Sequence, residues 1–215
     1  NDVILGNGSG QPIDMICDVL LNPGDVVITD SFVYGGTLNT LRRHFTDIRG
    51  VPSDESGMDP EALDKEIEKA IKADHKPKFV YLIPSFQNPQ GWTIPESRRK
   101  ELLAVTEKYG VPILEDDCYA DNRYDGDLPT SIFNLDDTNS VMYVGSFSKI
   151  IAPGMSLGYM TAPQLILDRA MGVKSGRVSE FTAMAVEKYA RKYLDAHIEE
   201  INNIQRTKRD AMLSA

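Results

Sequence analysis

The sequence predicts an α/β fold of three layers, in which a mostly parallel sheet lies between helices on both faces. Short strand-like runs that are apolar on successive positions alternate with stretches of helical periodicity. Such runs are typical of strands buried on both faces, which occur in parallel sheets covered by helices. Polar and glycine-rich segments follow several of the runs, at the sheet edge where ligand sites collect.

Residues that favour helix starts and stops place the predicted helices along the chain. Asp59 is an expected N-cap, and Pro60 follows it in the first turn, where proline is well tolerated. Thr93 and Glu96 have the spacing of a capping box, and Gly110 is the expected stop of that helix. The expected helices span residues 11–21, 60–73 and 94–109, with one or two long helices over residues 181–213.

The predicted strands lie between these helices. A first short strand, Val3–Leu5, runs into a glycine loop, and the others are Val26–Thr29, Lys78–Ile83, Val111–Leu114, Val141–Val144 and Leu157–Thr161. The chain begins at Asn1 and ends in a helical stretch without a stop signal. We therefore expect it to be a piece of a longer protein.

Composition argues against several classes of function. The 215 residues include 23 basic and 32 acidic side chains, a formal net charge of −9, which argues against nucleic acid or an anionic membrane surface as a partner. No apolar run approaches the ~20 residues that cross a bilayer. Cys17 and Cys118 suggest neither a disulfide framework nor a metal-ligand pattern, so we expect a cytoplasmic protein without a metal site.

Four polar loops are expected to converge on one edge of the sheet, namely Gly6–Gln11, Pro84–Gly91, Glu115–Tyr119 and Gly145–Lys149. The first opens a helix whose free N–H groups and dipole favour an anion such as phosphate. Taken alone, a Gly/Ser turn before a helix is more often only a connection. The second contains an Asn-Pro step, which restricts the asparagine and can adopt a cis bond. Four loops meeting at one edge indicate a ligand site.

Lys149 and the acids at residues 115–117 are the candidates for chemistry. A lysine at a strand end can form an imine with a carbonyl if its amine is kept neutral, whereas most lysines are simply solvated. One buried carboxylate among Glu115, Asp116 and Asp117 can pair with a pyridinium, bind a metal or act as a general base, and the other two acids are expected to be exposed. No histidine lies nearby, which disfavours a metal.

In their order along the chain, five segments resemble the large domain of fold-type I pyridoxal-phosphate enzymes, the class I/II aminotransferases. The matching segments are Asn7–Gln11, Asn22–Asp25, Phe86–Gly91, Glu115–Tyr119 and Gly145–Lys149. The resemblance covers nearly the whole chain. It implies an enzyme that transfers an amino group between an L-amino acid and a 2-oxo acid by a ping-pong mechanism, with pyridoxal 5'-phosphate as cofactor.

The resemblance assigns a role to each matching residue. Lys149 would hold the cofactor as an internal aldimine and carry a proton between the substrate's α-carbon and the cofactor. Asp116 would keep the pyridine nitrogen protonated, so that the ring accepts electrons. Tyr119 and Asn88 would hydrogen-bond the ring oxygen, and Tyr34 would stack on the ring face. The phosphate would be held by Ser9, Gly10, Gln11, Ser146 and Ser148.

The resemblance also implies a domain organisation. Residues 1–180 would form the cofactor-binding large domain, incomplete at its N-terminal side, and residues 181–215 would lead toward a C-terminal small domain. The family's active site takes residues from a second subunit, so a homodimer is expected. Ser156 departs from the family pattern, because members usually carry a phosphate-binding arginine seven residues after the lysine, here Lys149. Losing such a charged partner costs ~1.5–3 kcal/mol, so weakened cofactor retention is expected.

Three other interpretations stay open at this stage. A carbon–sulfur lyase on the same fold shares the cofactor residues and differs in its substrate contacts. A non-catalytic, cofactor-binding domain of a bacterial regulator has the same architecture without turnover. An inactive fragment is favoured by Ser156 and by the missing ends.

Overall fold

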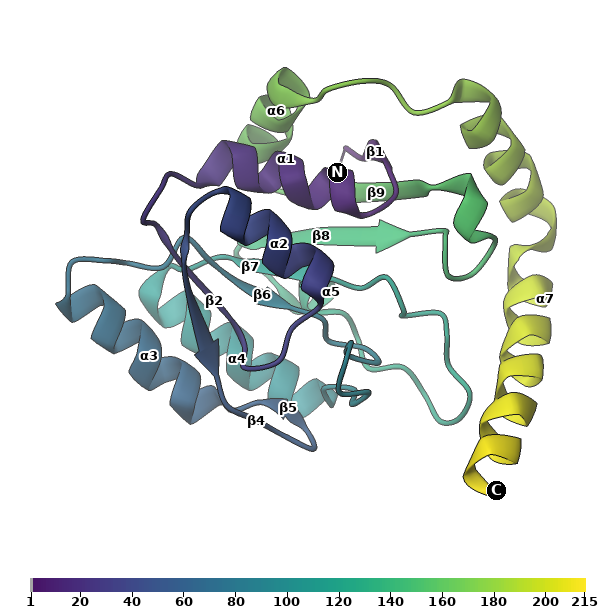
Figure 1. The fold of residues 1–215 in the computed structure, drawn as a ribbon, viewed down its shortest axis with the longest axis horizontal. Coiled ribbons are helices and arrows are strands. Elements are labelled where there is room, and N and C mark those ends of the chain that lie inside the picture. The colour runs from purple at the N-terminus through teal and green to yellow at the C-terminus, as the bar shows by residue number, and fades with distance from the viewer. Residues whose placement is uncertain (1) are drawn as a thin grey trace.

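A computed structural model describes residues 2–215 and shows a seven-stranded sheet between two layers of helices (Figure 1). The strands are β1 (Ile4–Asn7), β2 (Val26–Asp30), β3 (Asp47–Val51), β6 (Phe79–Leu82), β7 (Ile113–Asp116), β8 (Val141–Ser146) and β9 (Leu157–Thr161), with β4 (Ser53–Asp54) and β5 (Gly57–Met58) in a separate hairpin. The helices are α1 (Gly10–Leu20), α2 (Gly35–Arg43), α3 (Pro60–Lys72), α4 (Glu96–Tyr109), α5 (Ile132–Leu135), α6 (Gln164–Val173) and α7 (Glu180–Leu213), besides a 3-10 turn at Pro153–Met155.

The strand order across the sheet is β1-β9-β8-β7-β6-β2-β3. From β3 to β8 the neighbouring strands are parallel, whereas β9 pairs antiparallel with both β1 and β8. The predicted three-layer α/β fold with a mostly parallel sheet is therefore confirmed. Because parallel strands end at the same edge, the segments that follow β6, β7 and β8 are brought side by side.

Side chains alternate between two apolar cores, one on each face of the sheet. Phe79 and Tyr81 of β6 belong to the core shared with α1 and α6, whereas Val80 and Leu82 belong to the core shared with α3 and α4. Every residue of β2 and β6 is buried, which explains why these strands are apolar on successive positions. α7 runs along one side of the molecule (Figure 1).

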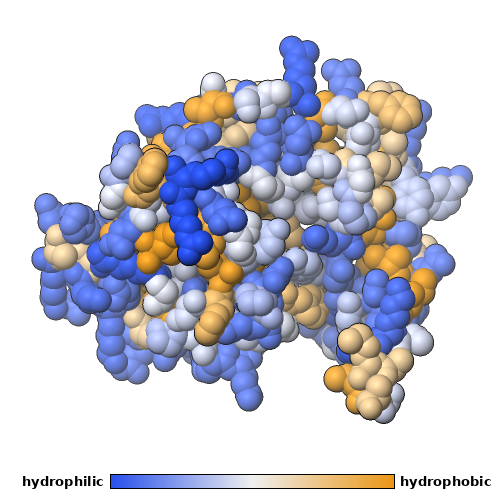
Figure 2. Space-filling view, in the orientation of Figure 1, coloured by the Kyte–Doolittle hydropathy of each residue, from blue (hydrophilic) through white to orange (hydrophobic). Residues whose placement is uncertain are grey.

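The face of the molecule seen in Figure 2 is largely hydrophilic. Hydrophobic side chains gather at the C-terminal end of α7, where Met212 and Leu213 are exposed. Among residues 2–215, none of the helices combines the length and the hydropathy needed to span a bilayer.

Several elements differ from the prediction. β7 and β8 end two residues later than expected, so Glu115, Asp116, Gly145 and Ser146 belong to strands rather than to loops. The sequence pattern does not predict α2, α5, α6 or β3. In α2 two of the three buried residues are threonines, so its apolar periodicity is weak. The long C-terminal segment forms the single helix α7.

Two of the predicted helix ends are confirmed. Asp59 caps α3, because its carboxylate accepts hydrogen bonds from the N–H groups of Glu61 and Ala62 at 2.8 and 3.3 Å. Gly110 ends α4 in the left-handed conformation, with φ 58°, which glycine adopts without a steric cost.

The predicted capping box of Thr93 and Glu96 is wrong. α4 begins at Glu96, directly after Pro95, because proline disfavours helical geometry in the residue before it. The Thr93 hydroxyl instead accepts a hydrogen bond from the Phe86 N–H at 3.1 Å. Thr93 therefore braces the Asn-Pro loop rather than the helix.

The expectation that Glu115 and Asp117 are exposed is also wrong. Glu115 is fully buried, and Asp117 is 6% exposed. The Glu115 carboxylate accepts hydrogen bonds from the Ile132 and Phe133 N–H groups at 2.9 and 2.8 Å, and it lies 3.9 Å from the Arg99 guanidinium. These partners offset only part of the cost of burying the carboxylate.

Arg99 joins this buried cluster to the edge of the sheet. Its guanidinium donates hydrogen bonds to the carbonyl oxygens of Ile94, Thr130 and Pro84 at 2.9, 3.1 and 3.2 Å, and to the Ser85 hydroxyl at 3.1 Å. One side chain of α4 thus holds the start of the loop that follows β6.

The two buried acids make stability depend on pH. Burial, followed by the charge of Asp117, raises the pKa of Glu115 to about 8, and burial raises the pKa of Asp117 to about 6. Carboxyl groups of an unfolded chain titrate near 4, so between these values the folded protein binds protons that the unfolded chain has released. The free energy of unfolding therefore falls as the pH rises from about 5 to about 8.

We expect the midpoint of thermal unfolding, followed by circular dichroism, to drop by roughly 10 °C between pH 5 and pH 8. Asp117→Asn should flatten this dependence, because it removes one titrating carboxyl and lowers the pKa of Glu115. Glu68→Gln, at an exposed position of α3, should leave it unchanged. A midpoint that rises over this range would contradict the explanation.

Candidate active site

A small cavity lies at the carboxyl ends of the parallel strands. It is lined by Ser9, Tyr34, Ile83, Asp116, Cys118, Tyr119 and Lys149. Apart from Ile83 and Cys118, these are site residues that the sequence predicts. The structure therefore brings together side chains from five separate segments of the chain.

Asp116 is the acid that lines this cavity, and it is buried at the end of β7 with 5% exposure. Its Oδ2 accepts a hydrogen bond from the Tyr81 hydroxyl at 2.7 Å, and its Oδ1 accepts one from the Cys118 thiol at 2.8 Å. Burial raises the pKa of Asp116, while these two hydrogen bonds and the charge of Lys149 oppose the rise. The carboxylate can therefore stay ionised if a cation lies beside it.

Lys149 lies in the turn that follows β8, and its side chain is exposed. Its amine is 5.8 Å from the centre of the Tyr119 ring. Lys149 and Asp116 line the same cavity. The Lys149 amine therefore reaches the cavity from the solvent side. There it can contact both a group bound in the cavity and a molecule that reacts with that group.

Asn88 and Tyr119, both predicted site residues, lie beside each other. The Asn88 amide donates a hydrogen bond to the Tyr119 hydroxyl at 3.4 Å, and the Asn88–Pro89 peptide bond is cis. Gln87, which is 1% exposed, ties this loop to the segment before α2 through a 2.7 Å hydrogen bond to the Phe32 carbonyl oxygen.

The residues predicted to hold a phosphate lie around the start of α1 and the end of β8. Ser9 directly precedes α1, Gly10 is its first residue, and no side chain caps the helix, so its first N–H groups can bind an anion. The Ser146 hydroxyl accepts a hydrogen bond from the Ser148 N–H at 3.2 Å.

The side chain of Gln11 is held by hydrogen bonds to other parts of the protein. Its Oε1 accepts a hydrogen bond from the Asn7 N–H at 2.9 Å, and its Nε2 donates one to the Ser175 carbonyl oxygen at 2.6 Å. Gln11 thus ties β1 to the segment before α7, and only its backbone N–H is left for an anion.

Ser156 borders the start of α1. Its carbonyl oxygen accepts a hydrogen bond from the Gly8 N–H at 2.6 Å, and its backbone is left-handed, with φ 45°. The two loops meet because residue 158 is a glycine, since a Cβ there would lie 2.4 Å from the carbonyl carbon of Gly8. The position at which the resemblance predicts an arginine is therefore next to the predicted phosphate site.

Tyr81 is a partner of Asp116 that the sequence pattern does not predict. A signal was present, because Tyr81 places a hydroxyl within the buried strand β6, and buried tyrosine hydroxyls usually need a partner. The identity of that partner depends on the pairing of β6 with β7, which no local pattern gives.

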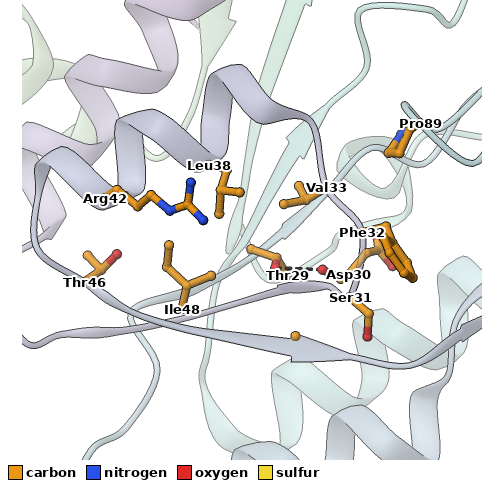
Figure 3. Close-up of a pocket in the computed structure, with 11 residues that line it drawn as sticks. Thr29, Asp30, Ser31, Phe32, Val33, Leu38, Arg42, Thr46, Ile48 and Pro89 are labelled. Atoms are coloured by element: carbon orange, nitrogen blue, oxygen red, sulfur yellow. Dashed lines mark hydrogen bonds between the residues drawn. The ribbon is translucent and has the colours of Figure 1, made fainter.

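A second hollow, of about 560 Å³, lies between the end of β2, α2 and β3 (Figure 3). Arg42 lines it from α2, and Thr29 and Asp30 line it from β2, with the Thr29 hydroxyl donating to the Asp30 carbonyl oxygen at 2.9 Å. Burial raises the pKa of Asp30 to about 6. Phe32 and Pro89 also line the hollow, so it adjoins the Asn-Pro loop.

Comparison with known proteins points to one family. The family model described as aminotransferase class I and II matches residues 1–215. Aromatic-amino-acid aminotransferase 1 of Thermococcus litoralis is 35% identical over 218 residues, which cover 100% of this chain and 52% of that protein.

Solved structures agree with this match. The kynurenine aminotransferase of Pyrococcus horikoshii superposes with a TM-score of 0.93 at 35% identity, over 99% of this chain and 54% of that one. The α-aminoadipate aminotransferase of Thermus thermophilus, solved with N-(5'-phosphopyridoxyl)-L-leucine, gives 0.92 at 30% identity, over 99% and 55%.

The chain thus spans about half the length of the relatives that it matches. Across that half, the family match is complete. The same strand edge also carries the amine, the buried acid and the helix start that the motifs predict. The chain belongs to the class I and II aminotransferases.

Proposed function

We propose that this chain is the cofactor-binding part of an enzyme that uses pyridoxal 5'-phosphate to move an amino group between an L-amino acid and a 2-oxo acid. The observation that carries the proposal is that Lys149 and Asp116 line one cavity. The Thermus thermophilus relative was solved with a phosphopyridoxyl amino acid, which supports the same cofactor here.

The chemistry of the residues around the cavity fits this cofactor. A protonated pyridine nitrogen is a cation of the kind that keeps a buried carboxyl such as Asp116 ionised. The amine of Lys149 is a nucleophile for the aldehyde. The start of α1 at Ser9 and the hydroxyl of Ser146 offer hydrogen-bond donors to the phosphate.

Each group then has a defined task. When bound, the cofactor supplies an electron sink for bond cleavage at the substrate's α-carbon. Lys149 binds the aldehyde and moves the proton at the α-carbon, while Asp116 holds the proton on the pyridine nitrogen. Tyr119 and Asn88 donate hydrogen bonds to the ring oxygen, and Tyr34 covers one face of the ring.

The remaining parts of the site are proposed to come from outside these residues. Residues 1–180 serve as the cofactor-binding large domain, and residues 181–215 lead to a small domain that binds the substrate carboxylate. A second copy of the chain covers Phe32 and Tyr34, which are 64% and 47% exposed. Both cysteines are buried and free, which suits a cytoplasmic protein.

Covalent labelling tests the proposal directly. The protein is mixed with pyridoxal 5'-phosphate and reduced with borohydride, and the labelled peptide is identified by mass spectrometry. We expect the label on Lys149 and its loss in Lys149→Ala, while Lys192→Ala, which removes an exposed lysine of α7, keeps it. No label on Lys149 at millimolar cofactor would overturn the proposal.

A panel of amino acids then separates the aminotransferase from the other hypotheses. Conversion of the bound cofactor to its amino form, with release of a 2-oxo acid, supports amino transfer. Release of pyruvate and ammonia identifies a carbon–sulfur lyase. Full-length protein that carries the label on Lys149 but converts no amino acid is a binding domain rather than an enzyme.

Ser156→Arg is expected to tighten the binding of pyridoxal 5'-phosphate roughly ten- to a hundredfold, because it supplies a charged donor beside the start of α1. The dissociation constant is measured by fluorescence titration. Ser214→Arg adds the same charge at the end of α7 and should leave the affinity unchanged. Equal affinities for Ser156→Arg and the parent would show that residue 156 does not face the phosphate.

A further inference from the structure

Asp116 is held by a directed chain of buried hydrogen bonds. The Thr37 hydroxyl donates to the Tyr81 hydroxyl oxygen at 3.0 Å, and the Tyr81 hydroxyl donates to Oδ2 of Asp116 at 2.7 Å. Thr37 is 3% exposed and Tyr81 is fully buried, so water does not compete for these groups. Such bonds polarise one another, and a bond to a charged acceptor is the stronger kind.

We propose that Tyr81 is a positioning residue that keeps the Asp116 carboxylate ionised and fixed in the cavity, and that Thr37 links this contact to α2. The inference rests on the proposed function, in which Asp116 faces the pyridine nitrogen. It assigns to this pair a role in cofactor binding beyond the packing of the core.

The groups around Asp116 favour this role over simple packing. The Tyr81 hydroxyl makes both of its hydrogen bonds to side chains, one of which lines the cavity. Burial, followed by the charge of Asp116, raises the pKa of both Tyr81 and Cys118. Both groups therefore stay protonated and remain donors, while Lys149 is the cation that acts on the same carboxylate.

The link to α2 follows from the first turn of that helix. Tyr34 directly precedes α2, and Thr37 is its third residue. Tyr34 lines the cavity, whereas Thr37 donates to Tyr81. The start of α2 thus places two groups. The Tyr34 side chain lies over the cavity, and the Thr37 hydroxyl is the group from which the hydrogen-bond chain to Asp116 begins.

The test compares Tyr81→Phe and Thr37→Val with Thr40→Val. Thr40 is a matched control, because it is also buried in α2 but its hydroxyl contacts Arg43 instead. We expect Tyr81→Phe to weaken the binding of pyridoxal 5'-phosphate roughly tenfold and to shift the pH dependence of the bound absorption band. Thr37→Val should act in the same direction by about threefold, and Thr40→Val should change neither quantity.

A second measurement needs no cofactor. Carbon-13 NMR of the Asp116 carboxyl should show a higher pKa in Tyr81→Phe, because a donor to the ionised form is lost. A merely structural role would lower the unfolding midpoint without moving this titration. If the parent binds no cofactor, the proposed function fails while the titration still tests the positioning role.

The inference is overturned if Tyr81→Phe leaves the affinity, the absorption band and the Asp116 titration unchanged. Should Tyr81→Phe not fold, the same three measurements on Thr37→Val decide the question. Thr37→Val keeps the shape of the side chain and exchanges only its hydroxyl for a methyl group.

Discussion

The proposed cofactor site depends on one buried carboxylate, Asp116, remaining charged. Removing a carboxylate from water is costly unless hydrogen bonds and a cation replace the solvent. Asp116 receives donors from Tyr81 of β6 and from Cys118 of its own loop, and the charge of Lys149 acts from the turn after β8. These groups meet because β6, β7 and β8 are parallel neighbours that end at one edge of the sheet.

The antiparallel strand β9 brings two other parts of the site together. It lies between β1 and β8, so the loop that opens α1 and the turn that carries Lys149 become neighbours although they are far apart in the sequence. Close approach requires glycine at two points, because a Cβ at Gly158 would meet Gly8 and a Cβ at Gly145 would meet the Tyr159 ring. The start of α1 and the Lys149 amine thereby reach the same cavity.

The parts of the molecule that sequence patterns predict are those with a local signal. Lys149 and the acids at residues 115–117 are found because they come after runs that are apolar on successive positions, and the family resemblance then selects Asp116 among the acids. Glu115 and Asp117 are misjudged because their burial depends on other parts of the chain: Glu115 accepts hydrogen bonds from Ile132 and Phe133 and lies near Arg99 of α4. α2 and β3 are missed for a related reason, since the surrounding tertiary structure stabilises them more than their own residue pattern does.

In the proposed chemistry, the contacts that retain the cofactor change from one step to the next. Lys149 cannot bond to the aldehyde and carry the proton at the substrate's α-carbon at the same time, since one amine serves both tasks. While that amine is free, only noncovalent contacts retain the cofactor: the carboxylate of Asp116 at the ring nitrogen and the donors around the start of α1 at the phosphate. A serine at position 156, beside that helix start, therefore weakens retention most during the chemical steps. Asp116 and the groups that keep it ionised then carry a larger share of the binding.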